Sequence, residues 1–221
     1  MKKKNKSDNK LLIINNKKYI ILFISLLLFV ILTYYIFNNK INYLDTSIQD
    51  LMISIRSDNL TNFITIITDL GSPYTLITIT VLLFFINKNK RIPILITLNL
   101  ICSAIISKLV VFLSKRNNLL EASLIAIEEG SSYKAGHPMI SIAFYMYLSY
   151  LIYKSTKNKI FKSCIIVLLF ILIIMISFSH IYLGTYYLSD ILSSLLLSIS
   201  YLMLFISITK NYLEKVKKWK L

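Results

Sequence analysis

Uncharged apolar runs about as long as a bilayer is thick are the feature that most constrains how this chain folds. The segment Tyr19–Phe37 contains no charged residue, and about 20 mostly apolar residues in a helix span the hydrocarbon core. Five further membrane-spanning helices are predicted, at Pro73–Ile86, Ile92–Leu113, Met139–Tyr153, Ile160–Phe178 and Asp190–Thr209. The predicted fold class is therefore all-α, an integral membrane bundle of six transmembrane helices.

The composition fits a membrane protein better than a soluble one. Of the 221 residues 56% are hydrophobic, and the mean hydropathy is +0.68, yet the formal net charge is +15. A nucleic-acid-binding domain would need a solvated basic face, whereas most of this chain lies in apolar runs, so we expect no nucleic-acid partner. Cys102 and Cys164 both lie inside apolar runs and imply no disulfide framework.

The distribution of positive charge predicts the orientation in the membrane. Six spans place both termini on one side, and 19 of the 25 lysines and arginines fall on that side. By the positive-inside rule both termini are cytoplasmic, in a multi-pass protein of the cell membrane. The run Tyr19–Phe37 is followed by no small-residue cleavage site and is interpreted as a retained signal anchor.

Three regions follow from these boundaries. Residues 1–18 form a basic cytoplasmic arm, residues 19–209 form the membrane domain, and residues 210–221 form a basic cytoplasmic tail. An excess of Ile, Asn and Lys indicates an AT-rich genome, which favours a bacterial source.

The segment Ile41–Leu70, on the predicted outer side, has the pattern of an amphipathic helix. Apolar residues recur at helical spacing between charged ones, namely Leu44, Ile48, Leu51, Met52 and Ile55. Such a helix lies at the membrane interface or packs on the end of the bundle. Gly71-Ser72-Pro73 is expected to break it before the second span.

Polar and ionisable residues form three clusters on the outer side. The clusters are Lys108 with Lys115 and Arg116, the stretch Tyr133–Pro138, and the stretch Ser179–Asp190. An ionisable group within or at the mouth of a membrane bundle indicates a functional site by default. Cations together with helix N-terminal amides favour an anion, especially a phosphate.

Each cluster also has a purely structural interpretation. Lys108 could snorkel to the interface, and Lys115–Arg116 could face lipid headgroups as a stop-transfer pair. His137 and Asp190 could only cap the fourth and sixth helices. The order and spacing of the clusters along the chain favour a shared site.

That order and spacing resemble the type 2 phosphatidic acid phosphatase (PAP2) superfamily of membrane lipid phosphatases. Where the family has a lysine followed seven residues later by Arg-Pro, this chain has Lys108, Lys115 and Arg116. Where the family has Pro-Ser-Gly-His, it has Lys134-Ala135-Gly136-His137. Where the family has Ser-Arg, five residues, His, three residues and Asp, it has Ser179-His180, Tyr186 and Asp190. The resemblance covers about residues 20–208.

The resemblance implies a phosphoryl-transfer site that needs no metal and no cofactor. In the family the third-motif His is the nucleophile, the Asp orients it, and the second-motif His protonates the leaving oxygen. By resemblance, His137 takes the general-acid position, Tyr186 the nucleophile position and Asp190 the orienting position. The phosphate-binding positions fall on Lys108, Lys115, Arg116, Ala135, Gly136 and His180.

Tyr186 in place of the nucleophilic histidine is the departure that matters most. A phenol ionises little at neutral pH, and a carboxylate at Asp190 disfavours its ionisation further. Loss of a covalent nucleophile removes most of the rate, on the order of several decades.

The phosphate-binding positions also depart from the family pattern. Lys115 keeps the charge of the family arginine but loses its bidentate fork, unless a one-residue slip lets Arg116 serve. Ala135 loses a hydroxyl donor. His180 makes the charge of the second arginine position depend on pH.

Three functions are weighed on this basis. The first is a diverged family member with reduced or lost hydrolysis that binds a lipid phosphate or a polyprenyl diphosphate at the outer leaflet. The second is an active phosphatase that uses Tyr186 or His180 as its nucleophile. The third is a non-enzymatic lipid-binding or transport bundle, although no inverted repeat is visible. In all three the lipid bilayer is a partner, and the sequence does not specify an oligomeric state.

Overall fold

The computed structural model describes residues 2–38, 40–87, 89–114, 137–155 and 158–214, and all regular structure in these ranges is helical. The helices are α1 (Lys2–Phe37), α2 (Asn42–Ser54), α3 (Asp58–Leu70), α4 (Pro73–Ile86), α5 (Arg91–Ser114), α6 (His137–Ser155), α7 (Lys159–Tyr182) and α8 (Leu188–Glu214). The predicted all-α class is confirmed. A helix is present at each of the six segments that the sequence predicts to span the membrane.

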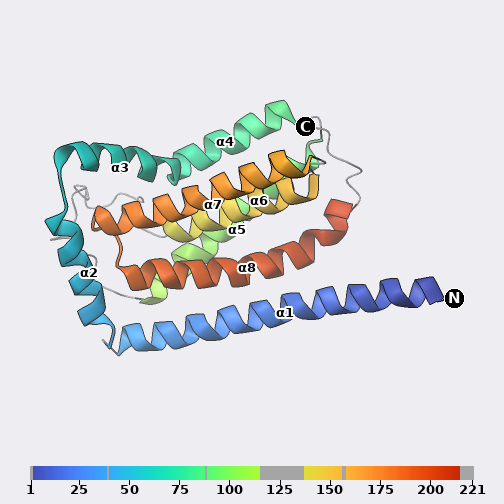
Figure 1. Cartoon of the computed structure of the whole chain (residues 1–221), viewed down its shortest axis with the longest axis horizontal. Helices are drawn as coiled ribbons and strands as arrows, with labels where there is room; N and C mark the ends of the chain where they lie inside the picture. The colour runs from blue at the N-terminus through green and yellow to red at the C-terminus, as the bar shows by residue number, and fades with distance from the viewer. Residues whose placement is uncertain (1, 39, 88, 115–136, 156–157, 215–221) are drawn as a thin grey trace.

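The long helices lie side by side in an up-and-down bundle (Figure 1). Helix α6 packs against α5, α7 and α8, and α1 lies along α8 on the outside of the bundle. At one end α5 and α7 finish while α6 and α8 begin, and we call this the α7–α8 end. Helix α2 crosses this end, as the view in Figure 1 shows.

Helix α6 forms the centre of the core. Every side chain from Met139 to Tyr145 is buried, and Tyr147 and Leu151 continue the buried surface toward the opposite end. Because its neighbours are protein rather than lipid, α6 can carry polar and aromatic side chains such as Ser141 and Tyr145. This explains why α6 is less apolar than the helices around it.

The number of spans depends on how short and broken helices are counted. Among the described residues four helices are long and apolar enough to cross a membrane alone, in α1, α5, α7 and α8. Helices α3 and α4 meet the same criterion only together, as a pair bent by 48°. Helix α6 lies in the bundle without meeting it, so the count of six spans and the cytoplasmic position of the termini stay predictions.

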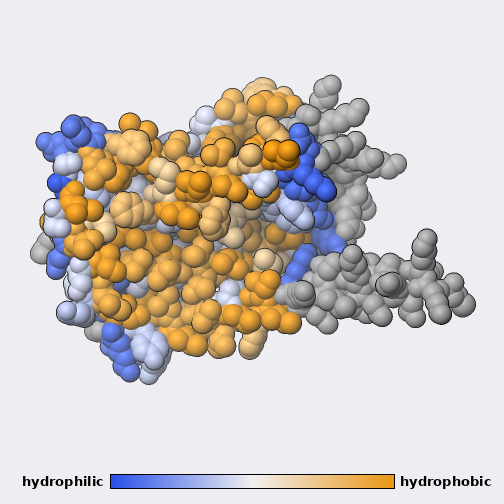
Figure 2. Space-filling model, viewed as in Figure 1, coloured by the Kyte–Doolittle hydropathy of each residue, from blue (hydrophilic) through white to orange (hydrophobic). Residues whose placement is uncertain are grey.

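Apolar side chains cover the middle of the molecule where lipid would lie. Figure 2 shows them over the central part of the face in view, with hydrophilic residues at its two ends. Exposed apolar residues on α1, α4 and α7 include Phe23, Phe85 and Leu168, with 65%, 80% and 64% of their surface exposed. Such a surface is what a hydrocarbon environment requires.

The predicted amphipathic segment forms two helices instead of one. Helix α2 ends at Ser54, and Ser57 adopts an extended backbone before α3 begins at Asp58. The side chains of α2 that face the bundle are Asp45, Gln49 and Met52. The alternative of a helix packed on the bundle end therefore describes α2, and two of the three residues on its buried face are polar.

The break that the sequence predicts at Gly71-Ser72-Pro73 is confirmed. Helix α3 ends at Leu70, and α4 begins with Pro73 after Ser72, whose hydroxyl accepts a hydrogen bond from the backbone N–H of Thr75. A Cβ atom at Gly71 would lie 2.7 Å from Cγ2 of Ile176 on α7. Glycine is therefore required for the close approach of this junction to α7.

Candidate functional site

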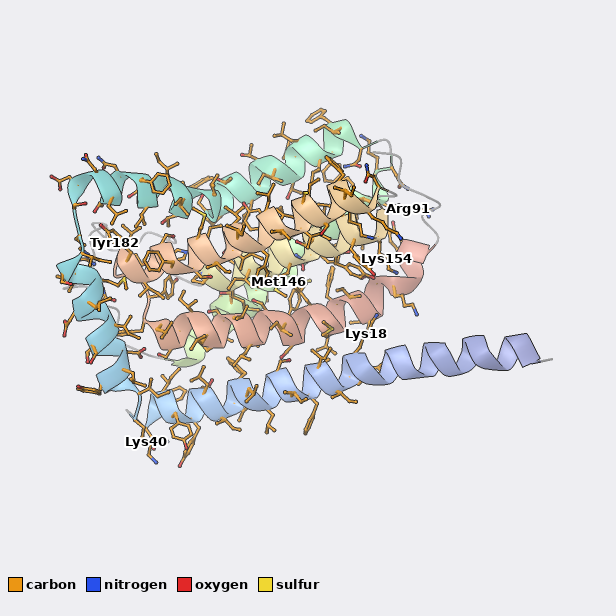
Figure 3. The ribbon with its side chains drawn as sticks, viewed as in Figure 1. Lys18, Lys40, Arg91, Met146, Lys154 and Tyr182 are labelled. Carbon is orange, nitrogen blue, oxygen red and sulfur yellow. The ribbon has the colours of Figure 1, made fainter. Side chains whose placement is uncertain are left out.

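The α7–α8 end gathers helix ends that carry residues of all three sequence clusters. Lys108 lies near the end of α5, His137 is the first residue of α6, His180 lies in the last turn of α7, and Asp190 lies in the first turn of α8. Figure 3 shows Tyr182 at this end and Arg91 and Lys154 at the opposite end. The topology therefore brings one residue of each of the first two clusters, and the third cluster, to one end of the bundle.

The first two clusters are described only in part. Lys115, Arg116, Ala135 and Gly136 lie outside the described residues, and of His137 only its place in the backbone is described. The side chain of Lys108 is exposed on α5. The phosphate-binding and general-acid roles expected of these residues stay predictions.

The third cluster is described completely, and a helix-ending turn sets its geometry. Gly184 has a positive φ of 74°, which favours glycine. The N–H of Gly184 donates to the carbonyl of Ile181 at 3.1 Å, and the N–H of Thr185 donates to that of His180 at 3.1 Å. This pair of bonds is a Schellman motif, and it ends α7 so that the chain can return into α8.

His180 is part of the framework of this turn. Its side chain is buried, with 3% of its surface exposed. The hydroxyl of Thr185 donates to the carbonyl of His180 at 3.0 Å and lies 3.2 Å from Nδ1 of the same residue. A hydroxyl has one proton to donate, so Nδ1–H is the donor in the second bond, which fixes the tautomer and the orientation of the ring.

Tyr186 packs on His180 instead of projecting freely. The two rings meet edge to face, with centroids 5.3 Å apart and planes at 86°. Tyr186 also packs against a small apolar cluster under α2, which we call the α2 cluster: Met52, Ile64, Ile181, Tyr182, Leu183 and Ile191. The residue at the nucleophile position is thus half-buried in an aromatic and aliphatic surrounding.

Asp190 caps the N-terminus of α8 from the third helical position. Its Oδ2 accepts a hydrogen bond of 3.2 Å from the backbone N–H of Tyr187, the residue before α8. A carboxylate at the third helical position that bonds back to the cap residue is one half of a capping box. Asp190 therefore has a capping contact, although it lies at the third helical position and not at the N-cap position weighed in the sequence.

Asp45 is a site residue that the sequence reasoning missed. Its carboxylate is buried, with 2% of its surface exposed, and reaches from α2 to the start of α8. It accepts a hydrogen bond of 3.0 Å from the N–H of Ser189 and one of 2.5 Å from the hydroxyl of the same residue. Asp45, Gln49 and Met52 recur at helical spacing, but two of them are polar, so an apolar pattern could not reveal this buried face.

Arg56 ties the loop after α2 to the end of α7. Its Nε and Nη2 donate to the carbonyl of Tyr182 at 3.2 and 3.0 Å, where a cation also complements the helix dipole. The hydroxyl of Tyr182 in turn accepts from the N–H of Ser57 and bonds Thr61 at 3.1 Å. Burial lowers the pKa of Arg56, but an arginine remains charged at neutral pH.

The donor atoms of the described residues do not suggest a metal centre. Within these ranges no group of three or more His, Cys, Asp or Glu side chains could hold a metal ion.

Comparisons with known proteins agree with the resemblance seen in the sequence. The model of the PAP2 superfamily matches residues 22–214. A crystal structure described as the first transmembrane PAP2 type phosphatidylglycerolphosphate phosphatase from Bacillus subtilis superposes with a TM-score of 0.74 and 24% sequence identity, over 90% of this chain and 98% of that chain. None of the curated proteins compared with the chain matches it.

Proposed function

The chain belongs to the PAP2 superfamily, and from this premise we propose that it binds a lipid phosphate at the α7–α8 end with reduced or lost hydrolysis. It is a multi-pass membrane protein with the fold of a membrane phosphatase. The ligand class in this proposal is a lipid phosphate monoester or a polyprenyl diphosphate. The proposal places the site at the outer leaflet of a bacterial cell membrane, with six spans and both termini in the cytoplasm.

The observation that carries the proposal is the environment of Tyr186. The residue at the nucleophile position has a phenol in place of an imidazole, and its ring packs edge to face on His180 and against the α2 cluster. A phenolate nucleophile would need nearby cations to favour its ionisation. The contacts given for the ring are with His180 and with the apolar α2 cluster, and a carboxylate at Asp190, four residues away in sequence, would oppose ionisation.

The roles of Asp190 and His180 support the same conclusion. Asp190 accepts the N–H of Tyr187 as a helix cap, and His180 is bonded to Thr185 within the turn. Each retained or substituted residue of the third cluster thus has a structural role that does not depend on catalysis. Residues with such structural roles can maintain the fold after the nucleophile is lost.

Phosphate binding in this proposal depends on the first two clusters. Lys108, Lys115 and Arg116 supply positive charge, Gly136 supplies an amide, and His137 supplies a further donor. These residues come from the end of α5, the start of α6 and the segment between them. We therefore expect the affinity for a phosphate-bearing lipid to fall when Lys108 is replaced by methionine.

The test is a phosphate-release assay on the purified full chain in detergent. Phosphatidic acid, phosphatidylglycerol phosphate and an undecaprenyl diphosphate are the substrates, and we expect release at least several decades slower than that of an active family member. Release that is fast and is abolished by Asp190→Asn would overturn the proposal.

Two variants separate the remaining chemistries. Tyr186→His restores the family nucleophile, and a gain of phosphate release in this variant would show that the rest of the site is intact. Tyr186→Phe removes the hydroxyl while keeping the ring. If wild-type turnover were measurable and Tyr186→Phe lost it, the active-phosphatase alternative with a tyrosine nucleophile would replace the proposal.

A further inference from the structure

Gln49 is a buried amide for which the structure gives no hydrogen-bond partner. It lies on the inward face of α2 with 4% of its surface exposed, and neither Oε1 nor Nε2 has a partner among the described residues. Buried polar side chains are nearly always hydrogen-bonded, because an unmade bond leaves the cost of desolvation uncompensated. An amide with both polar atoms unpaired among the described residues is therefore a candidate site for a ligand group that can donate and accept hydrogen bonds.

The position of Gln49 is defined by its neighbours along α2. One turn before it, Asp45 bonds Ser189 at the start of α8. Nearly one turn after it, Met52 belongs to the α2 cluster, against which Ile48 and Tyr186 also pack. Gln49 thus lies on the buried face of α2, between the residue that bonds the start of α8 and the residue that joins the cluster contacted by Tyr186.

The charges around this face determine which chemical group suits Gln49. The carboxylates of Asp45 and Asp190 both accept backbone N–H groups at the start of α8, so a further anion beside them would be repelled. An amide offers donors and an acceptor at once. A hydroxyl group can both donate to and accept from the amide of Gln49. Because it carries no charge, it is not repelled by the carboxylates of Asp45 and Asp190.

We propose that Gln49 binds a hydroxyl group on the headgroup of the phosphate-bearing ligand and thereby selects hydroxylated headgroups. This inference rests on the proposed function, since it assigns the phosphate to the cationic clusters and the hydroxyl to α2. The ligand class is a phosphate ester that carries a polyol. Gln49 is the only glutamine in the sequence, so substituting it removes the only glutamine side chain from the protein.

The experiment compares two short-chain lipids of equal charge on the purified full chain in detergent. Phosphatidylglycerol carries two free hydroxyls on its headgroup, whereas phosphatidylmethanol carries none. We expect wild type to bind phosphatidylglycerol about fivefold more tightly, which is the gain from one net hydrogen bond. In Gln49→Met, of similar volume, the preference should disappear through loss of phosphatidylglycerol affinity alone.

The controls separate this inference from the proposed function. Ser47→Ala, on the exposed face of α2, should keep the wild-type preference, and Gln49→Asn, with a shorter amide, should lose most of it. Equal affinities for the two lipids in wild type, or an unchanged preference in Gln49→Met, would overturn the role of Gln49 while lipid binding stands. Absence of binding for both lipids and for phosphatidic acid would overturn the proposed function itself.

Two further readouts complete the test. Ligand-free Gln49→Met should unfold at the same temperature as wild type or a higher one, because the substitution removes an unpaired buried amide. A marked fall would show that the amide serves packing and would count against the proposal. If glycerol 3-phosphate competes with the lipid and Gln49→Met weakens this competition, the hydroxyl bound by Gln49 belongs to a free polyol phosphate. If only lipids compete, the hydroxyl belongs to a membrane lipid headgroup.

Discussion

Two carboxylates from distant parts of the sequence bond the first turn of α8. Asp45 accepts the N–H and the hydroxyl of Ser189, and Asp190 accepts the N–H of Tyr187. A helix N-terminus favours negative charge, and here the chain itself supplies that charge. In the proposed site we therefore expect a phosphate to bind the cations of the first two clusters rather than the amides that begin α8.

Asp45→Asn tests this contact at the level of one residue. The amide keeps one acceptor but loses the charge and turns a donor toward the hydroxyl of Ser189, so we expect the free energy of unfolding to fall by about 1–3 kcal/mol. Reversible unfolding in mixed micelles measures the change. Asp50→Asn, on the exposed face of the same helix, is the matched control and should stay within about 0.5 kcal/mol of wild type; equal effects of the two would contradict the assignment.

At the scale of elements, the junction between α3 and α4 shows how a broken helix is accommodated inside the bundle. The axes of α3 and α4 are bent by 48° at this junction, and the bend leaves backbone groups without helical partners. The hydroxyl of Tyr145 on α6 donates to the carbonyl of Leu70 at 2.6 Å, and the hydroxyl of Thr75 donates to that of Asp69 at 2.6 Å. Neighbouring side chains thus satisfy the freed carbonyls, as a lipid environment requires.

Gly71→Ala is predicted to strain this junction. The added Cβ would meet Cγ2 of Ile176 at 2.7 Å, and overpacking of this kind costs about 1–3 kcal/mol. The double variant with Ile176→Ala removes the clashing methyl group, so its destabilisation should be smaller than the sum of the two single changes. Thermal unfolding of the three variants in one detergent measures the coupling, and strict additivity would argue against the contact.

Sequence patterns predicted the helices well where contact with lipid requires apolar side chains, and the ends of helices where glycine or proline interrupts them. Tyr19–Phe37 and Ile160–Phe178 are helices because their exposed sides must be apolar, and Gly71-Ser72-Pro73 breaks the chain whatever surrounds it. The inward positions of Asp45 and Gln49 could not be predicted, because a polar residue on an amphipathic helix ordinarily faces water. The carboxylate of Asp45 is bonded by Ser189, which lies 144 positions away in sequence. The α2 cluster likewise joins Met52 and Ile64 to residues between Ile181 and Ile191, more than 100 residues away.

At the scale of the whole molecule, the end of the bundle opposite α2 carries cations packed on tyrosines. Lys162 lies 3.9 Å from the ring centroid of Tyr153, and Lys154 lies 5.6 Å from that of Tyr150. Aromatic residues and lysines are typical of the boundary between hydrocarbon and headgroups. These pairs favour a membrane interface at this end, where the positive-inside rule predicts the cytoplasm.

Cysteine labelling tests the orientation. In a background with Cys102 and Cys164 replaced by alanine, Ser47→Cys on α2 should react with a membrane-impermeant maleimide in intact cells. Lys154→Cys should react only after permeabilisation, because we place it on the cytoplasmic side. Labelling of Lys154→Cys in intact cells with protection of Ser47→Cys would reverse the predicted topology.

The contact between α1 and α8 has a consequence for biosynthesis. The hydroxyls of Ser25 and Ser200 lie 2.7 Å apart across 175 positions of sequence, and α1 has its main contact with α8. At about 5–20 residues per second, the ribosome has inserted α1 many seconds before it makes the helix that receives it. Until α8 is made, α1 lies in lipid and Ser25 has no partner on α8. We therefore expect nascent chains truncated before α8 to be recognised by membrane proteases and degraded faster than the full chain.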